Sequence, residues 1–134
     1  MRHLTSSAPR IGALIGALAA LFASGAAAEE AVAGDSAKGA RVFQRCAVCH
    51  TFDPAQRRAG PHLKGLFGRK AGSVEGHRYS PAMAKSDVVW SEETLRAFLK
   101  NPRANMPGTT MVIGVPRDSD LNDLLAYLKE KSAE

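Results

Sequence analysis

The stretch RCAVCHTF, residues 45–52, contains both cysteines of this 134-residue chain. Cys46 and Cys49 are separated by two residues, and His50 follows the second thiol directly. Two sulfurs and an imidazole within five residues form a compact set of groups that can bind a metal ion, a cofactor or each other. The group that these three side chains bind therefore determines how the rest of the chain is interpreted.

Three interpretations of the stretch need other parts of the chain to support them. A structural disulfide suits an exported chain with an even number of cysteines, but closing so short a loop constrains the unfolded chain little. A thioredoxin-like redox pair requires a βαβ setting, and no strand pattern precedes Cys46. A structural zinc site requires four ligands, so His62 or His77 would have to complete it at a spacing unlike that of a zinc finger.

The fourth interpretation is the haem c attachment signature, C-x-x-C-H. On a helix, Cys46 and Cys49 would lie one turn apart on the same face, where both sulfurs can add to the two vinyl groups of one haem. His50 would then project beneath the ring and present a nitrogen to the iron. The spacing favours this interpretation over the other three, with one covalently bound haem held by two thioethers and an axial histidine.

Three segments have the periodicity of amphipathic helices. The first begins after residues 34–36 and should run through the attachment stretch to His50. The second, SEETLRAFLKN, begins at Ser91 and should be stopped by Pro102. The third, DSDLNDLLAYLKEK, places leucines at positions i, i+3, i+4 and i+7, namely Leu121, Leu124, Leu125 and Leu128. The pattern predicts an all-α fold with three principal helices.

The segments between these helices have no regular pattern. Residues 51–79 contain five glycines and two prolines, and only a short helical turn is expected after them, around Ser80–Ser86. Residues 103–116 form a second loop. Structureless connections near 30 residues long are uncommon in compact domains. A large apolar cofactor would explain them, because glycine-rich loops can wrap it and approach it closely.

The second axial position of such an iron decides between an electron carrier and an enzyme. Met111 is favoured because it follows a Pro-Gly turn in an irregular loop, which can aim a thioether at the metal. Met83 is expected on the short helical turn, and methionines more often fill a core. The other side chains considered are Met106, His62, His77 and Lys100, with His62 and His77 expected to be exposed. Ligation by histidine and methionine favours the reduced metal and leaves no open position for peroxide or dioxygen.

The N-terminus has the features of a signal peptide. Basic residues precede an apolar run from Ile11 to Phe22, and Ala26, Ala27 and Ala28 provide the small residues of a cleavage site. Residues 1–28 are therefore expected to be a signal peptide and residues 29–134 the haem-binding domain. The alternative is a membrane anchor formed by residues 11–28, for which the apolar run is marginal in length.

Charge is distributed unevenly along the chain. Residues 38–103 carry 13 basic and 5 acidic side chains, whereas residues 104–134 carry 3 basic and 5 acidic ones. The middle of the chain is therefore a candidate docking face for an acidic partner. Nucleic acid is not expected as a partner, because the chain has an export signal and no nucleic-acid-binding motif.

The chain resembles class I cytochrome c over essentially all of residues 34–131. GDSAKGARVFQRCAVCHTF, residues 34–52, is similar to the N-terminal helix and haem-binding segment of the family. GPHLKGLFGRKAG, residues 60–72, is similar to the loop on the histidine side, and WSEETLRAFLKNPRANMPGTTM, residues 90–111, to the third helix and methionine loop. DLLAYLKE, residues 123–130, is similar to the closing helix. The segments occur in the order found in the family.

The resemblance assigns roles to particular residues. It implies that Cys46 and Cys49 form the thioethers and that His50 and Met111 are the axial ligands. It also implies that the carbonyl oxygen of Pro61 accepts the Nδ1 proton of His50, which would fix the tautomer and orientation of the ring.

Further residues match positions that contact the haem propionates or join the terminal helices in the family. Arg69, Tyr79 and Trp90 match the positions that hydrogen-bond the propionates, and Thr109 matches a position near the inner one. The contact between the first and last helices is implied for Gly39, Phe43, Leu124 and Tyr127.

The chain departs from the family pattern at three positions. Phe98 stands where the family usually has a tyrosine, and Met83 where it usually has an asparagine, so we expect a drier pocket on the methionine side. Thr110 replaces a lysine that is common beside the methionine ligand. The docking charge would then be carried by a basic rim of Arg45, Lys64, Lys100 and Arg103.

The sequence therefore predicts a periplasmic, monomeric, monohaem one-electron carrier rather than an enzyme. It would pass electrons between redox partner proteins of a respiratory or related chain by docking them on the basic rim. It would contact a membrane only if residues 11–28 are retained. The alternative is a haem enzyme or sensor with an open iron, such as a peroxidase.

Overall fold

The computed structural model describes residues 33–134, so the signal peptide predicted for residues 1–28 lies outside the described residues. The described chain forms helices α1 (Ser36–Phe43), α2 (Pro81–Ala84), α3 (Glu92–Lys100), α4 (Pro102–Asn105) and α5 (Asp118–Ala133). Extended pairing within residues 33–134 is limited to one isolated bridge between Lys70 and Val89. The prediction of an all-α fold is confirmed, with α1, α3 and α5 as the principal helices.

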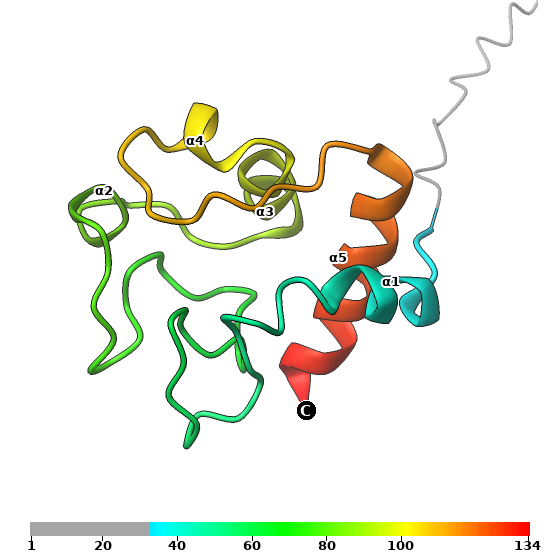
Figure 1. The fold of residues 1–134 in the computed structure, drawn as a ribbon, viewed down its shortest axis with the longest axis horizontal. Helices are drawn as coiled ribbons and strands as arrows, with labels where there is room; N and C mark the ends of the chain where they lie inside the picture. The colour runs from blue at the N-terminus through cyan, green and yellow to red at the C-terminus, as the bar shows by residue number, and fades with distance from the viewer. Residues whose placement is uncertain (1–32) are drawn as a thin grey trace, which may run out of the picture.

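Helices α1 and α5 pack against each other at one end of the molecule (Figure 1). Gly39 makes this possible, because a Cβ atom added there would lie 2.0 Å from the carbonyl oxygen of Asp123 on α5. The ring centroids of Phe43 and Tyr127 are 5.3 Å apart at the same crossing, and Leu124 is fully buried. The predicted contact between the first and last helices is therefore confirmed.

The first helix is shorter than the sequence predicted. It begins beside Asp35, whose side chain accepts a hydrogen bond from the backbone N–H of Lys38, but it ends at Phe43 rather than His50. Beyond this residue the backbone forms mixed turns. The N–H groups of Cys46 and Ala47 both donate to the carbonyl oxygen of Phe43. The N–H groups of Cys49 and His50 likewise share the carbonyl oxygen of Cys46. These shared acceptors tighten the backbone, so the attachment stretch is a series of turns and not a continuous helix.

Helix α3 begins where the sequence predicted. The side chain of Ser91 accepts from the backbone N–H of Thr94, and the Thr94 hydroxyl accepts in return from the N–H of Ser91. Leu95, Phe98 and Leu99 form its buried face. Pro102 follows the end of α3 as predicted and also occupies the first position of the short helix α4, where a proline loses no hydrogen bond.

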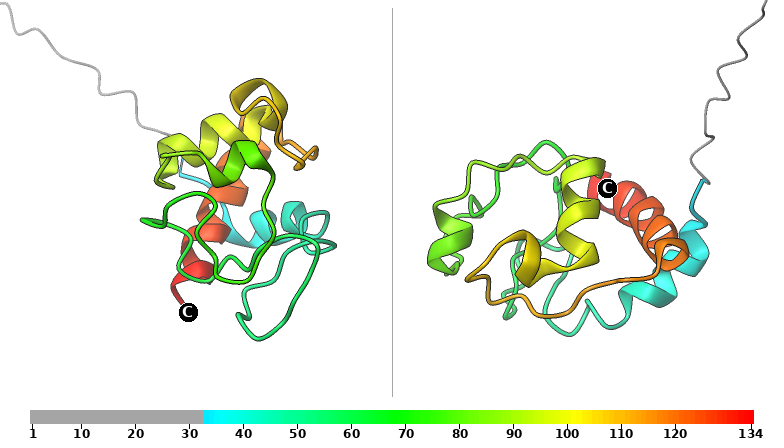
Figure 2. Two further views of the ribbon diagram at one scale, coloured as in Figure 1. Left: turned by 90° about the vertical axis from the view of Figure 1, so that its left-hand side faces the viewer. Right: turned by 90° about the horizontal axis from the view of Figure 1, so that it is seen from above.

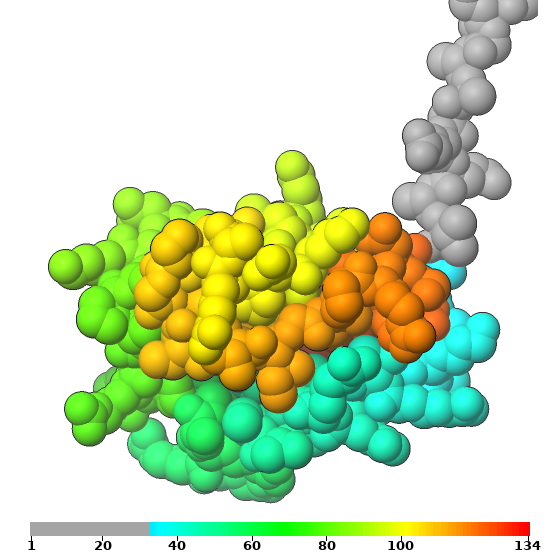
Figure 3. Space-filling view, turned by 45° about the horizontal axis from the view of Figure 1, so that its top comes forward, coloured from blue at the N-terminus to red at the C-terminus, as the bar shows by residue number. Residues whose placement is uncertain are grey.

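Long loops connect these helices and occupy the space between the packed helix pair and α2, which lies at the opposite end of the molecule (Figure 2). In the space-filling view, the yellow-to-orange segment of residues 101–117 lies beside the teal segment that follows α1 (Figure 3). None of the helices in the described part of the chain combines the length and the apolar character needed to cross a bilayer.

Candidate functional site

The loops and helices enclose a cavity with a volume of ≈ 410 Å³. Its walls come from the turns after α1, the loop of residues 59–80, one face of α3, the loop of residues 109–113 and the inner face of α5. Most of the lining side chains are apolar, including Leu66, Leu95, Leu99, Leu124 and Leu128. Segments far apart in the sequence therefore share one interior space that side chains alone do not fill.

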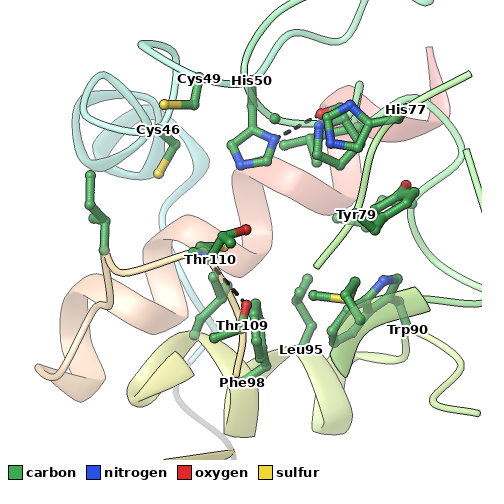
Figure 4. A pocket seen from close by; sticks show the side chains of 18 of the residues that line it. Cys46, Cys49, His50, His77, Tyr79, Trp90, Leu95, Phe98, Thr109 and Thr110 are labelled. Carbon is green, nitrogen blue, oxygen red and sulfur yellow. Dashed lines mark hydrogen bonds between the residues drawn. The ribbon is translucent and has the colours of Figure 1, made fainter. Parts of the chain in front are cut away.

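The attachment residues meet at one wall of this cavity. Cys46, Cys49 and His50 lie next to one another there, and Trp90, Leu95 and Phe98 lie on the far side (Figure 4). Both thiols are half-buried, and they are not joined in a disulfide. Burial raises the pKa of the Cys46 thiol, an effect that exceeds the opposing influence of Arg45. The turns thus bring two thiols and an imidazole to the same space.

His50 is held in the orientation that metal ligation requires. Its Nδ1 lies 2.8 Å from the carbonyl oxygen of Pro61, which can only accept, so Nδ1 carries the proton and Nε2 keeps its lone pair. Burial lowers the pKa of His50, and the positive charge of Arg69 lowers it further, against the raising effect of the bond to Pro61. The ring is therefore a neutral imidazole. Gly60 provides the room, since a Cβ atom there would lie 2.5 Å from the ring.

Three of the proposed sixth ligands line the cavity. They are Met111, Met83 and His77. The loop that carries Met111 is fixed by the hydroxyl of Thr109, which accepts the backbone N–H of Met111 at 3.2 Å. The remaining three candidates do not line this cavity. Met106 is buried in the hydrophobic core, Lys100 forms an ion pair with Asp118 at 2.8 Å, and His62 lines a neighbouring groove.

The four residues matched to the haem propionates also line the cavity: Arg69, Tyr79, Trp90 and Thr109. The Arg69 guanidinium donates to the carbonyl oxygens of His62 and Lys64, each at 2.9 Å. The Tyr79 hydroxyl accepts the backbone N–H of Val74 at 3.1 Å. These bonds fix both side chains at the cavity wall, while their contact with propionates stays a prediction.

Two histidines differ from the sequence prediction. His62 and His77 were expected to be exposed, but both are half-buried. His77 packs edge-on against Tyr79 with ring centroids 4.7 Å apart, and the Nδ1 atom of His62 is buried without a hydrogen-bond partner in the described part of the chain. The glycine-rich loops fold back on themselves here, and their lack of periodicity left no signal for this burial.

Sequence reasoning also missed basic residues at the cavity. Lys70 and Arg78 line it together with Arg45, whereas Lys64, Lys100 and Arg103 of the predicted rim do not. Lys70 pairs with Asp87 at 2.9 Å. The only available signal was the general excess of positive charge in residues 38–103, which does not specify individual positions.

The cavity residues fit a haem c. Two thiols at C-x-x-C spacing, a neutral imidazole with its free nitrogen available, and a thioether in a neighbouring loop all line one apolar space. The absence of a side chain at Gly60 is itself part of the fit, because the His50 ring occupies that position.

Comparisons with known proteins agree with this chemistry. The sequence profile of the cytochrome c family matches residues 36–132. The chain is 42% identical over 116 residues to cytochrome c2 of Blastochloris viridis, covering 85% of this chain and 91% of that protein. It is 41% identical over 99 residues to cytochrome c-550 of Nitrobacter winogradskyi, covering 72% of this chain and 91% of that protein.

A solved structure extends the similarity to the fold. Cytochrome cH from Methylobacterium extorquens matches with a TM-score of 0.67 and 37% identity, covering 72% of this chain and 99% of that one. With the C-x-x-C-H stretch at the wall of the cavity, these similarities establish the cofactor as a single haem c. The chain belongs to the cytochrome c family as a class I member, an electron-transfer protein rather than an enzyme, with one covalently attached haem.

Proposed function

We propose that this protein is a periplasmic one-electron carrier whose haem iron is ligated by His50 and Met111. The observation that carries the proposal is the hydrogen bond from His50 Nδ1 to Pro61, which leaves Nε2 available in the same cavity that Met111 lines. Iron X-ray absorption of the oxidised holoprotein tests the ligand set. One sulfur and one imidazole nitrogen in axial positions are expected, and two axial nitrogens would contradict it.

The residues around the cavity would each serve electron transfer without taking part in bond chemistry. The haem, when bound, supplies an iron that accepts and releases one electron. His50 is held as a neutral donor, and Cys46 and Cys49 tie the group to the chain. Met111 would supply a thioether ligand to the iron, so that no substrate would reach the metal. The apolar walls of the cavity exclude water. Less solvent then has to reorient when the iron gains or loses an electron, which lowers the reorganisation energy of electron transfer.

Polar residues at the cavity would bind the two propionate groups. We propose that Arg69 and Trp90 donate hydrogen bonds to them, together with Tyr79 and Thr109. Arg69 supplies the positive charge that compensates a buried carboxylate. Because its guanidinium is already held by the carbonyl oxygens of His62 and Lys64, little side-chain entropy would be lost when it binds.

We also propose that residues 1–28 are a cleaved signal peptide and residues 29–134 the mature, monomeric domain. The basic start, the apolar run and the Ala26-Ala27-Ala28 site support this division. Mass spectrometry of the protein from the periplasm should find Glu29 as the first residue. A mature protein that retains residues 11–28 would instead be the anchored form.

Partner docking is proposed to use positive charge around the haem edge. Val112 and Ile113 line the cavity mouth and are 58% and 42% exposed, and Arg45 lies on the same cavity. Lys64 and Arg103 are exposed and have no ion pair within residues 33–134, whereas Lys100 is offset by Asp118. Most of the positive charge available for docking is therefore supplied by Arg45, Lys64 and Arg103, and less by Lys100.

The rate of reduction by an acidic redox partner should fall as ionic strength rises, because salt screens the attraction between the rim and the partner. Stopped-flow measurements over a salt series test this. Arg45→Gln should lower the rate at low salt. Arg41→Gln, which removes the same charge from an exposed position on α1 away from the cavity, should leave it nearly unchanged. Equal effects of the two variants would contradict docking at the rim.

Restoring the tyrosine at position 98 should raise the reduction potential. Phe98 is 3% exposed and lines the same cavity as Met111, so a hydroxyl placed there would lie in the space that the Met111 thioether also lines. A hydrogen bond donated to the Met111 sulfur withdraws electron density from the ligand and disfavours the ferric state. Protein-film voltammetry of Phe98→Tyr measures the change, with Phe98→Leu as the control without a hydroxyl. No shift beyond error, or an equal shift in both variants, would exclude this hydrogen bond.

A further inference from the structure

A second groove lies on the histidine side of the haem cavity and has a volume of ≈ 370 Å³. Three arginines line it, Arg57, Arg58 and Arg78, together with the two half-buried histidines, His62 and His77. We refer to this set as the arginine groove. Glu75 is the only carboxylate among its lining residues, so the groove has a net charge of +2 with both histidines neutral.

Two of the three arginines are held in place by backbone carbonyl oxygens, and none of the three is neutralised by a carboxylate of the described residues. Arg57 donates to the carbonyl oxygen of Gly76 at 3.2 Å, and Arg58 donates to the carbonyl oxygen of Ala47. No carboxylate of residues 33–134 lies within ion-pairing distance of these two side chains or of Arg78. A guanidinium has five N–H donors, so each side chain keeps several donors and its full charge.

A second observation points to a ligand at this position. The Nδ1 atom of His62, which lines the same groove, is buried without a hydrogen-bond partner in the described residues. Buried polar atoms are normally paired, and an unpaired one calls for an explanation such as a bound water or ion. Guanidinium groups around a concave polar surface match the oxygens of a phosphate or related anion.

We propose that the arginine groove binds a small phosphate-class oxyanion, such as inorganic pyrophosphate. The groove is concave and of limited volume, which favours a small ligand over an extended acidic surface. It shares Gly60, Pro61, His77 and Arg78 with the haem cavity. An anion bound there adds negative charge near the iron and stabilises the ferric state, so anion binding lowers the reduction potential. By linkage, the ferric protein binds the anion more tightly than the ferrous protein does.

Isothermal titration calorimetry of the holoprotein with sodium pyrophosphate at fixed ionic strength tests the site. We expect saturable binding of one anion per protein, with a lower midpoint potential in its presence. Arg78→Gln should weaken binding about tenfold, as expected for the loss of one charge-assisted hydrogen bond. Arg78 is exposed and has no ion pair in residues 33–134, so this variant should fold normally. Arg41→Gln, the matched change of charge, should bind as the parent does.

Several outcomes would overturn the proposal. Equal affinity in Arg78→Gln and the parent would place the anion elsewhere, and so would equal losses in Arg78→Gln and Arg41→Gln. Vesicles of phosphatidylcholine with an anionic phospholipid provide the second arm. If these bind the parent protein and pyrophosphate neither binds nor competes, the cationic surface serves a membrane and not a small anion. An unchanged potential at saturating pyrophosphate would refute the coupling to the haem.

Discussion

Replacing Met111 by alanine should lower the reduction potential by on the order of 0.2 V, within the roughly 0.8 V range that axial ligands span. The thioether favours ferrous iron, and its loss removes that preference. Alanine is too short to reach the metal from the loop fixed by Thr109, so the sixth position becomes accessible. Voltammetry and carbon monoxide binding to the reduced protein measure the two effects, and rapid, tight binding of the gas is expected only in the variant.

Two other methionines serve as controls for this experiment. Met106 is buried in the core and does not line the cavity, so Met106→Leu should leave the potential within error of the parent. Met83 does line the cavity, and Met83→Ala is the sharper comparison. If Met83→Ala opens the iron to carbon monoxide while Met111→Ala does not, the assignment of the axial ligand is wrong.

Gly39→Ala should destabilise the folded protein by about 3 kcal/mol, at the upper end of what overpacking costs. The added methyl would lie 2.0 Å from the carbonyl oxygen of Asp123 and 2.7 Å from the Cβ atom of Tyr127. A backbone atom cannot rotate away as a side chain can, so α1 and α5 would have to separate. Denaturant unfolding of the holoprotein, followed by helical circular dichroism, measures the loss.

Lys38→Ala is the matched control, because it changes the neighbouring residue of α1 on its exposed side. Surface substitutions of this kind usually lie within about 0.5 kcal/mol of the parent. A Gly39→Ala variant as stable as Lys38→Ala would mean that the two helices are not packed as closely as the structure places them.

Local sequence signals predicted α3 and α5 because each is specified by short-range chemistry. Ser91 and Thr94 form reciprocal caps at the start of α3, and the leucines of α5 repeat at helical spacing. The same reasoning failed at the end of α1. Periodicity continued through Cys46 and His50, but it cannot distinguish a helix from successive tight turns that share the carbonyl oxygens of Phe43 and Cys46.

Some residues of the site could be predicted from the sequence and others could not. The C-x-x-C-H spacing alone indicated the cofactor and its attachment residues. The irregular loop after a Pro-Gly turn indicated Met111, and the resemblance added Trp90. The burial of His62 and His77 could not be predicted from the sequence. The path of residues 51–79 depends on packing around the haem cavity and has no repeating pattern. The ion pair that offsets Lys100 joins residues 18 positions apart across a loop, which sequence order does not reveal.

The covalent attachment of the haem through Cys46 and Cys49 can be measured directly. Holoprotein produced with the c-type maturation machinery should be denatured in acid, extracted with an organic solvent and weighed intact by mass spectrometry. We predict that the colour stays with the polypeptide, that its mass includes one haem, and that neither cysteine reacts with an alkylating reagent. A colourless polypeptide with two reactive thiols, or one whose thiols are joined only to each other, would contradict the account.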